Sequence, residues 1–296
     1  MSLAIVEVPT ALGLSPAPGT AGSPRGPWRA PDVLAGTGLF ERLGARVAAR
    51  IEVAAYDPAP EAIDGARNTA GVARQTTDIA AAVSSVLEAG DRPLILGGDC
   101  SVLLGPMLAL RRMGRYGLVF LDGHLDFRHL GNSQRLAAVA GEDLAIVTGR
   151  GLDALAAIDD LRPYVRNTDV VALGERERDS QTADVYASGI EVIGLDALRR
   201  QGMVACATAA ADQLRDSGCQ GFWIHLDLDV LDSAVLPAVD SPQPDGLVPD
   251  QLVALLETLS AHPSAIGLDV TIYDPELDGD GSGAQLVSNL LVGALA

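Results

Sequence analysis

The sequence predicts a single α/β domain in which a doubly wound parallel sheet of about eight strands lies between two layers of helices. Short runs rich in Val, Ile and Leu alternate with longer segments rich in Ala and Leu, which is the pattern of repeated β–α units. Two of the short runs, PLIL and LVFL, lack polar side chains, so strands there would be buried on both faces. The composition, 48% hydrophobic but only 4% aromatic, suits such a sheet.

The expected strands begin with AIVEV near the N-terminus and end with SAIGLD near the C-terminus. They are residues 4–8, 51–55, 93–96, 117–121, 169–173, 191–193, 221–228 and 264–269. The segments of helical length that lie between them are rich in Ala and Leu. The expected helices are residues 66–89, 103–112, 196–216, 249–261 and 283–296.

Three irregular stretches predict loops. Residues 9–31 are rich in Pro and Gly, residues 127–134 follow a strand, and residues 232–249 carry LPAVDSPQPDGLVP. Loops of this length in a compact domain are often binding loops. Because no internal repeat, low-complexity tail or domain boundary is visible, we expect residues 1–296 to form one domain.

Charge and composition limit the classes of partner. With 21 basic and 39 acidic residues the formal charge is −18, which argues against a nucleic-acid or anionic-membrane partner. Three cysteines are too few for a disulfide framework. The N-terminus shows no basic segment followed by an apolar run, and no stretch reaches the roughly 18 apolar residues of a membrane helix. The sequence therefore predicts a soluble cytoplasmic protein.

Charged residues gather where three apolar strands end. The segments are LILGGDCS, LVFLDGHLD and FWIHLDLDVLD. Parallel sheets bind ligands beyond the carboxyl ends of their strands, and residues at i, i+2 and i+4 of an extended segment face the same way. The side chains expected to converge there are Asp122, His124, Asp126, Asp227 and Asp229, and Cys100 follows the first of the three strands.

These residue types predict a metal site. Four carboxylates at one sheet edge would repel one another and shift their pKa values, and divalent cations remove that repulsion. Carboxylate and imidazole are ordinary ligands of Mn, Fe, Co, Ni and Zn. A pair of ions produces a metal-bound hydroxide that attacks an electrophilic carbon. A lone Asp-x-Asp at a strand end is more often a turn or cap, so the prediction depends on all three segments together.

The order GGD-x-S, D-x-H-x-D and D-x-D-x-x-D resembles the arginase, agmatinase and formiminoglutamase family, the ureohydrolases, over essentially the whole chain. The resemblance implies an eight-stranded sheet with two Mn ions at its carboxyl edge. By position, Asp122 and Asp227 would bridge the ions. Asp126 and Cys100 would complete one shell, and His124 and Asp229 the other. Asp126 would also accept a hydrogen bond from the bridging hydroxide.

The resemblance also suggests substrate contacts. LGERERD is similar to the stretch that reaches the amino end of the substrate, which would place Asp179 near an amine; the alternative is an exposed loop acid. Asn132 resembles a substrate-contacting Asn.

Cys100 is the first departure from the family, which has His at this position. A neighbouring metal would deprotonate the thiol. Four carboxylates and one thiolate then give the ligands a total charge of −5, against +4 from two divalent ions. With His in place of Cys100 the ligand charge would be −4. The ions would be weaker Lewis acids, and Zn, Fe, Co or Ni remain alternatives to Mn. The opposing interpretation is a small buried Cys beside a single metal.

Two further departures lie on the substrate side. Arginases carry a proton-transferring His in a Gly-Asn-x-His loop, where this chain has Gln134, which cannot transfer a proton. His129 is a candidate replacement, against the alternative of a solvated loop His. Ile272 stands where guanidine-cleaving members have a Glu, and Asp274 or Glu276 could compensate.

Together these features predict a hydrolase of a C–N bond in a guanidine, N-hydroxyguanidine, amidine or amide small molecule, derived from an amino acid, rather than a plain arginase. A resemblance to N-hydroxyarginine amidinohydrolases, which carry a Cys at this ligand position, favours N-hydroxyguanidines. Two alternatives stay open: a non-catalytic metal-dependent binding or regulatory protein, and an amine deacetylase of the related fold. The resemblance also implies a homo-oligomer.

Overall fold

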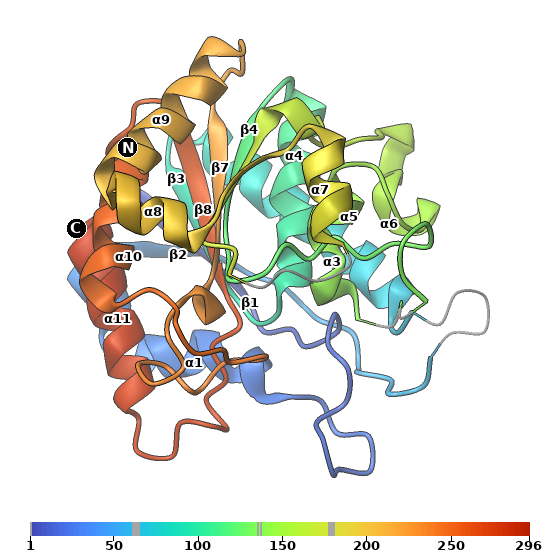
Figure 1. The fold of residues 1–296 in the computed structure, drawn as a ribbon. Helices are drawn as coiled ribbons and strands as arrows, with labels where there is room; N and C mark the ends of the chain where they lie inside the picture. Colours follow the sequence, from blue (N-terminus) through green and yellow to red (C-terminus); the bar gives the residue numbers. More distant parts are fainter. Residues whose placement is uncertain (1, 61–65, 135, 137, 177–180) are drawn as a thin grey trace.

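Eight parallel strands form one sheet in the order β2-β1-β3-β8-β7-β4-β5-β6 (Figure 1). The computed structural model describes residues 2–60, 66–134, 136, 138–176 and 181–296. The strands are β1 Leu3–Val8, β2 Arg46–Arg50, β3 Arg92–Gly97, β4 Gly117–Leu121, β5 Val170–Leu173, β6 Glu191–Ile193, β7 Phe222–Asp227 and β8 Ala265–Thr271. The arrangement confirms the predicted doubly wound α/β class.

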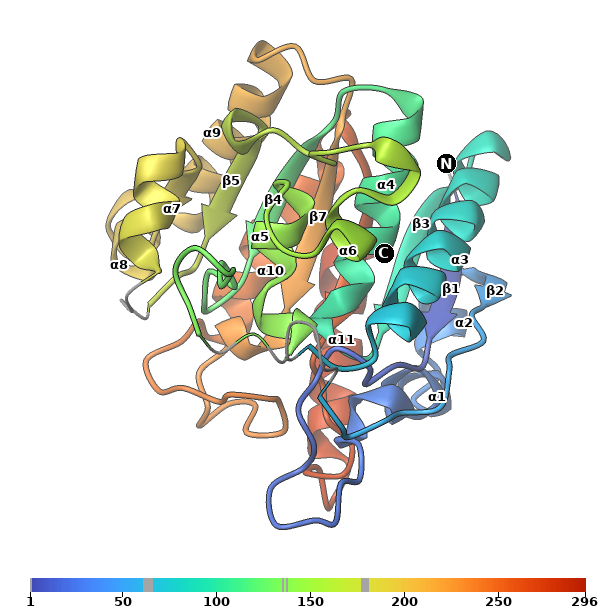
Figure 2. The ribbon, with the colours of Figure 1, turned by 90° about the vertical axis from the view of Figure 1, so that its right-hand side faces the viewer.

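Helices cover both faces of the sheet. One layer holds α3 to α7 and the other holds α1 and α8 to α11, as Figures 1 and 2 show from two directions. The helices are α1 Ala30–Gly36, α2 Leu39–Leu43, α3 Thr69–Glu88, α4 Leu104–Met113, α5 Asp143–Val147, α6 Asp153–Ala156, α7 Thr182–Ser188, α8 Leu195–Gln201, α9 Met203–Asp216, α10 Pro249–Ala261 and α11 Ser282–Leu295.

The alternation of side chains along each strand divides the core in two. Ile5 and Val119 pack in the layer of α8 to α11, whereas their neighbours Val6 and Phe120 pack in the layer of α3 and α4. Because successive residues of a strand face opposite sides, an uninterrupted apolar strand fills both layers. This is the reason that PLIL and LVFL lie in the centre of the sheet.

The second strand was predicted in the wrong place. It is Arg46–Arg50 rather than residues 51–55, and it is an edge strand that pairs only with β1. Its register runs from Ala4↔Arg46 to Glu7↔Arg50. The strand pairing with β1 therefore ends before the IEVAA segment begins. An exposed edge strand needs little apolar character, which is why the more hydrophobic segment was the better sequence candidate.

The predicted helix over residues 196–216 is two helices. Gly202, with φ 94° and ψ 138°, separates α8 from α9, a conformation that glycine adopts at no steric cost. Several short helices of four to seven residues were not predicted, because such lengths hardly show a 3.6-residue period. Within the described ranges, no helix is long and apolar enough to cross a membrane.

Candidate metal centre

Three strand ends meet at one edge of the sheet. In the sheet order β3-β8-β7-β4, the carboxyl ends of β3, β7 and β4 point the same way. Cys100 begins the turn after β3, Asp122 directly follows β4, and Asp227 is the last residue of β7. The parallel topology thus brings together segments that are more than 100 residues apart.

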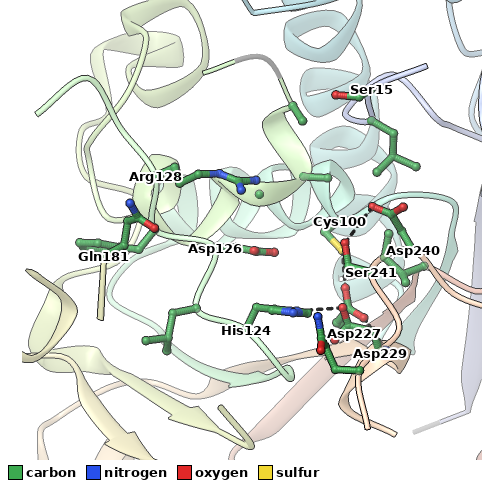
Figure 3. Close-up of a pocket in the computed structure, with 18 of the residues that line it drawn as sticks. Ser15, Cys100, His124, Asp126, Arg128, Gln181, Asp227, Asp229, Asp240 and Ser241 are labelled. Carbon is green, nitrogen blue, oxygen red and sulfur yellow. Dashed lines mark hydrogen bonds and ion pairs between the residues drawn. The ribbon is translucent and has the colours of Figure 1, made fainter. Parts of the chain in front are cut away.

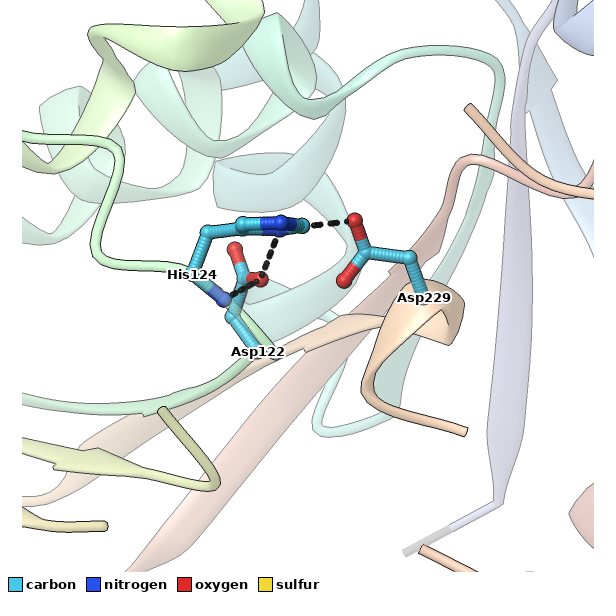
Figure 4. Close-up of side chains that lie close together, drawn as sticks. All are labelled: Asp122, His124 and Asp229. Carbon is cyan, nitrogen blue, oxygen red and sulfur yellow. Dashed lines mark hydrogen bonds and ion pairs between the residues drawn. The ribbon is translucent and has the colours of Figure 1, made fainter. Parts of the chain in front are cut away.

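Asp122, His124 and Asp229 form the tightest group of possible ligands. One donor atom from each lies within 4.8 Å of the others (Figure 4). His124 Nδ1 is 2.9 Å from Asp229 Oδ2 and 3.7 Å from Asp122 Oδ1. No other set of three His, Cys, Asp or Glu side chains is gathered this closely in the part of the chain that the structure describes.

The two Asp-containing motifs use the same local turn. Asp122 Oδ1 accepts the amide of His124 at 2.7 Å, and Asp227 Oδ1 accepts the amide of Asp229 at 2.6 Å. An Asp that bonds the backbone two residues onward closes a turn just after the strand. In each turn one carboxylate oxygen accepts the backbone hydrogen bond, and the second oxygen takes no part in the turn.

The buried charges of this group call for a cation. Asp122 Oδ2 and Asp229 Oδ1 are buried and have no hydrogen-bond partner within the described ranges. Burial, together with the Asp122 charge, raises the pKa of Asp229 to about 6. Burial alone would lower the pKa of His124, but hydrogen bonds to Asp122 and Asp229 raise it to about 12. A protonated His124 therefore supplies the positive charge between the two carboxylates. A divalent ion would supply more charge and bind all three side chains, so the residues fit a metal.

Cys100 and Asp227 form a second potential binding group. Cys100 is 1% exposed, and its Sγ donates to Asp227 Oδ2 at 2.7 Å. Burial, and next the Asp227 charge, raises the pKa of the thiol well above its usual value. The group is therefore a protonated pair without a cation, and a bound ion would displace the proton and take both donor atoms.

Asp126 reaches this second group from the loop after β4. Its φ is 40°, in the left-handed region that non-glycine residues adopt mainly where the surrounding structure holds them. Burial and the charges of Asp122 and Asp229 raise its pKa well above the ordinary range, although His124 and Arg128 oppose the shift. The strained backbone directs a carboxylate toward the other ligands (Figure 3).

Five of these side chains, Cys100, His124, Asp126, Asp227 and Asp229, line a cavity of about 400 Å³, and Asp122 lies beside them. We call the six predicted ligands Cys100, Asp122, His124, Asp126, Asp227 and Asp229 the floor. The remaining polar and apolar lining comes from loops that surround it (Figure 3). We call the following lining residues the wall: Ser15, Arg25, Arg128, Gln181, Asp240, Ser241, Gln243 and Ile272.

Two predicted site residues, His129 and Asn132, do not line this cavity. Asn132 Oδ1 accepts the amide of His129 at 2.9 Å, and Asn132 Nδ2 donates to the carbonyl of Phe127 at 3.0 Å. His129 Nδ1 accepts the amide of Gly131 at 3.1 Å. Both side chains are used to close their own turn, so the structure does not bring them to the floor. Asp179 lies outside the described residues.

Ile272 lies on the wall, as expected for the position where a Glu was missing. Its φ is 74°, and its amide donates to the carbonyl of Gly98 at 2.8 Å. A β-branched residue with positive φ is a true outlier and marks a constrained position. The carboxylate of Asp274, by contrast, accepts hydrogen bonds from the amides of Gly26 and Glu276. Neither Asp274 nor Glu276 lines the cavity, so neither side chain replaces the missing Glu.

A buried network behind the floor was not predicted. His225 Nδ1 lies 2.5 Å from Asp269 Oδ2, which is on β8, and its ring stacks on Phe120 at 4.8 Å. Its Nε2 lies 3.8 Å from Asp143 Oδ2. Burial and the charges of Asp126 and Asp122 raise the pKa of Asp143 well above its usual value. His225 alternates with Asp227 on β7, which was a usable signal, but nothing in the sequence pointed to Asp143.

Arg176 is a further missed residue. Its Nη2 donates to the carbonyl of Asp229 at 2.7 Å, and a Cβ on Gly123 would lie 2.0 Å from its Nη1. Gly123 inside the D-x-H-x-D motif therefore makes room for a guanidinium beside the acidic cluster. This positive charge lowers the pKa of Asp229, against the larger effect of burial.

Comparisons with known proteins show the family to which the chain is similar. The model of the arginase family matches residues 1–296. An arginase of Bacillus caldovelox is 29% identical over 231 residues, covering 77% of this chain and 76% of that protein. A formimidoylglutamase of Halobacterium salinarum is 29% identical over 221 residues, covering 72% and 66%. The solved B. caldovelox arginase structure has a TM-score of 0.89 at 26% identity, covering 100% of this chain and 98% of that one.

Proposed function

This chain belongs to the arginase family, and we propose that it is a binuclear metal-dependent hydrolase of a C–N bond in a guanidine, N-hydroxyguanidine, amidine or amide small molecule. The observation that carries the proposal is the floor itself. Six side chains of metal-binding type gather where three strands end, and five of them line one cavity. Carboxylate oxygens without partners are among them, as a site that holds cations requires.

The described donors divide into two sets. Asp122, His124 and Asp229 would hold one ion, Cys100, Asp126 and Asp227 would hold the other, and Asp122 and Asp227 would serve both. The closeness of Asp122, His124 and Asp229 and the contact between Cys100 and Asp227 support this division. Divalent ions, Mn in the first instance, would lower the pKa of a nucleophilic water and polarise the reacting carbon of the substrate. The thiol donor leaves Zn, Fe, Co and Ni as alternatives.

Asp126 is the residue we propose for proton transfer. Its carboxylate lines the cavity, and burial gives it a raised pKa. A carboxylate of this kind takes up a proton from the nucleophile and returns it to the leaving nitrogen. His129 is held in its own turn. Among the described residues of the wall there is therefore no histidine that could share the proton transfer with Asp126.

The wall supports a substrate other than plain arginine. Ile272 offers no charge to a guanidinium, and Asp240 is already paired with Arg25. A neutral or weakly basic group is therefore the better match to the described wall. The predicted substrate remains a small molecule derived from an amino acid, and homo-oligomer formation and a cytoplasmic location remain predictions.

The proposal is tested by loading the protein with Mn and measuring turnover of a small panel. The panel is L-arginine, N-hydroxyarginine, agmatine, 4-guanidinobutyrate and formiminoglutamate, with release of urea, hydroxyurea or ammonia as the readout. We expect turnover of at least one member, abolished in Asp227→Asn. Silence across the panel with two ions bound per chain would instead favour the non-catalytic binding protein.

A further inference from the structure

We propose that a second cavity, at the edge of the sheet opposite the metal centre, binds a small oxyanion of the phosphate type through Arg111, Arg115 and Arg166. These three residues belong neither to the floor nor to the wall. The inference therefore does not depend on the proposed function.

The second cavity has a volume of about 160 Å³ and lies where β4 and β5 begin. Arg115 and Tyr116 come just before β4, whereas Asp122 of the floor directly follows that strand. Arg166 and Asp169 line the cavity from the segment that leads into β5. Because the strands are parallel, their beginnings lie at the opposite edge of the sheet from the floor. The second cavity is thus a separate site.

The charge of the second cavity is opposite to that of the chain. Three arginines and one acid, Asp169, are the charged residues of its described lining. Three positive charges against one negative leave +2, in a chain whose formal charge is −18. Neighbouring positive charges repel one another, and an anion that binds between them removes this repulsion.

Arg115 is held in one orientation by Asp169. Its Nε and Nη2 donate to the two carboxylate oxygens of Asp169 at 2.8 and 2.7 Å, and Asp169 is fully buried. This double hydrogen bond fixes the plane of the guanidinium, while Nη1 has no partner among the residues that the structure describes. A guanidinium that is already fixed loses little conformational freedom when an anion binds.

Arg111 is anchored in a similar way near the end of α4. Its Nε donates to the carbonyl of Pro163 at 3.1 Å, which leaves both terminal nitrogens without a partner in the described part of the chain. Arg166 is exposed, and its side chain makes no hydrogen bond or ion pair with any described residue. The cavity therefore offers two anchored guanidinium groups and a third that is free to approach a ligand.

The size of the second cavity and its donors define the ligand class. A volume of about 160 Å³ is well below the roughly 300 Å³ at which pockets for drug-sized ligands begin, so it fits a small anion rather than a nucleotide. Guanidinium donors match the oxygens of phosphate in pairs. Three of them favour phosphate, which carries close to two negative charges at pH 7, over a singly charged carboxylate.

The apolar part of the lining suits a phosphate that is bonded to carbon. Tyr116, Pro163 and Val165 lie around the same cavity as the arginines. Free phosphate and a small phosphate monoester share the chemistry that the arginines recognise, and the monoester would also contact these side chains. A polyanion such as a nucleic acid would be repelled by the remaining surface of the acidic chain.

The test measures binding of inorganic phosphate and of glycerol 3-phosphate to the protein by calorimetry. Chloride and acetate at matched ionic strength report the effect of charge alone. We expect saturable binding of one phosphate per chain, tighter than that of chloride or acetate and weakened by added salt. Tighter binding of glycerol 3-phosphate than of phosphate would identify the monoester as the ligand, and the reverse order would identify free phosphate.

Arg111→Met should weaken phosphate binding roughly 10- to 100-fold, the usual effect of losing charge-assisted hydrogen bonds. Arg111→Lys keeps the charge but loses the planar donors, so it should recover part of the loss. Arg166→Met should weaken binding by roughly 2- to 5-fold, because an exposed charge contributes less. Neither arginine forms an ion pair within the described ranges, so we expect these variants to fold as the wild-type protein does.

Two controls locate the binding. Arg112→Met changes the next residue of α4, which pairs with Asp159 and does not line the second cavity, and it should bind phosphate as the wild-type protein does. Phosphate also binds divalent metals, so the titration is repeated with Asp227→Asn, which changes the floor alone. The binding that depends on Arg111 should persist in this variant.

The inference would be overturned if phosphate showed no saturable binding at millimolar concentrations. It would also be overturned if Arg111→Met and Arg166→Met bound phosphate as tightly as the wild-type protein, or if chloride bound as tightly as phosphate. Hydrolytic activity takes no part in these measurements, so a failure of the proposed function would leave the inference standing.

Discussion

The floor and the wall of the cavity are built in different ways. Floor residues lie on strands or within a few residues of a strand end, and paired backbone turns orient two of them, Asp122 and Asp227. Wall residues come mostly from loops that are far apart in the chain, although Ile272 directly follows β8. The sheet therefore positions the chemistry, while the loops can vary the substrate at little cost to the fold.

The same contrast appears in how charge is balanced. The floor is a group of like charges that needs cations from outside. On the wall, Arg25 and Asp240 neutralise each other. Losses on the floor should therefore abolish the reaction, whereas losses on the wall should redirect it.

The largest effect is expected on the floor. Asp227→Asn removes one negative charge from the acceptor shared by Cys100 and the amide of Asp229. We expect less than one tightly bound ion per chain by elemental analysis, and a fall in kcat/KM of more than about 100-fold, which is the upper range for residues that act only behind a ligand.

Asp78→Asn, on the exposed side of α3, is its control and should keep both ions and full activity. Two ions retained in Asp227→Asn would show that the floor does not depend on this carboxylate.

Cys100 separates the two halves of the floor. Cys100→Ala should keep the ion held by Asp122, His124 and Asp229 and lose the other, with activity reduced roughly 10- to 100-fold. Cys100→His should keep both ions, since imidazole replaces the thiolate. In the cobalt-substituted wild-type protein we expect a thiolate-to-cobalt charge-transfer absorption that Cys100→His lacks. Two ions in Cys100→Ala would mean that the thiol is a buried bystander.

Metal removal should destabilise the fold to a smaller, measurable extent. A ligand present at 100 times its dissociation constant adds about 2.7 kcal/mol to the free energy of unfolding, and we expect a loss of this order for each tight ion removed by a chelator. Thermal unfolding with and without Mn measures it. Asp122→Asn should show no Mn-dependent shift; a full shift in that variant would place the stabilising ion elsewhere.

The smallest effect is expected on the wall. Ile272→Glu adds a carboxylate that faces the cavity. The backbone at residue 272 is already left-handed, and Glu is not β-branched, so the substitution should add no backbone strain. We expect the ratio of kcat/KM for L-arginine, whose guanidinium is charged, to that for N-hydroxyarginine, whose N-hydroxyguanidine is much less basic, to rise about 10-fold. Ile272→Leu keeps an apolar side chain and should leave the ratio unchanged. An unchanged ratio in Ile272→Glu would remove Ile272 from the specificity argument.

The sequence by itself determined the sheet and most of the floor, because both depend on local patterns. Apolar runs specify buried strands, and acids that follow such strands lie at the carboxyl edge of the sheet. In the structure the two Asp motifs close turns there and do not continue as the extended segments that a spacing of two residues suggests. Asp122, His124, Asp227 and Asp229 could therefore be placed at strand ends from the letters alone. The resemblance to the ureohydrolases added their order and Cys100.

Only the tertiary structure decided the wall and the support behind the floor. The contact of Arg128 with Gly141 and the pairing of Arg25 with Asp240 join different loops, and His225 meets Asp269 and Asp143 from separate elements. His129 and Asn132 were expected at the cavity, but their polar atoms form hydrogen bonds within their own turn. No local period encodes such contacts; they follow from how packed loops satisfy buried polar groups once the sheet has formed.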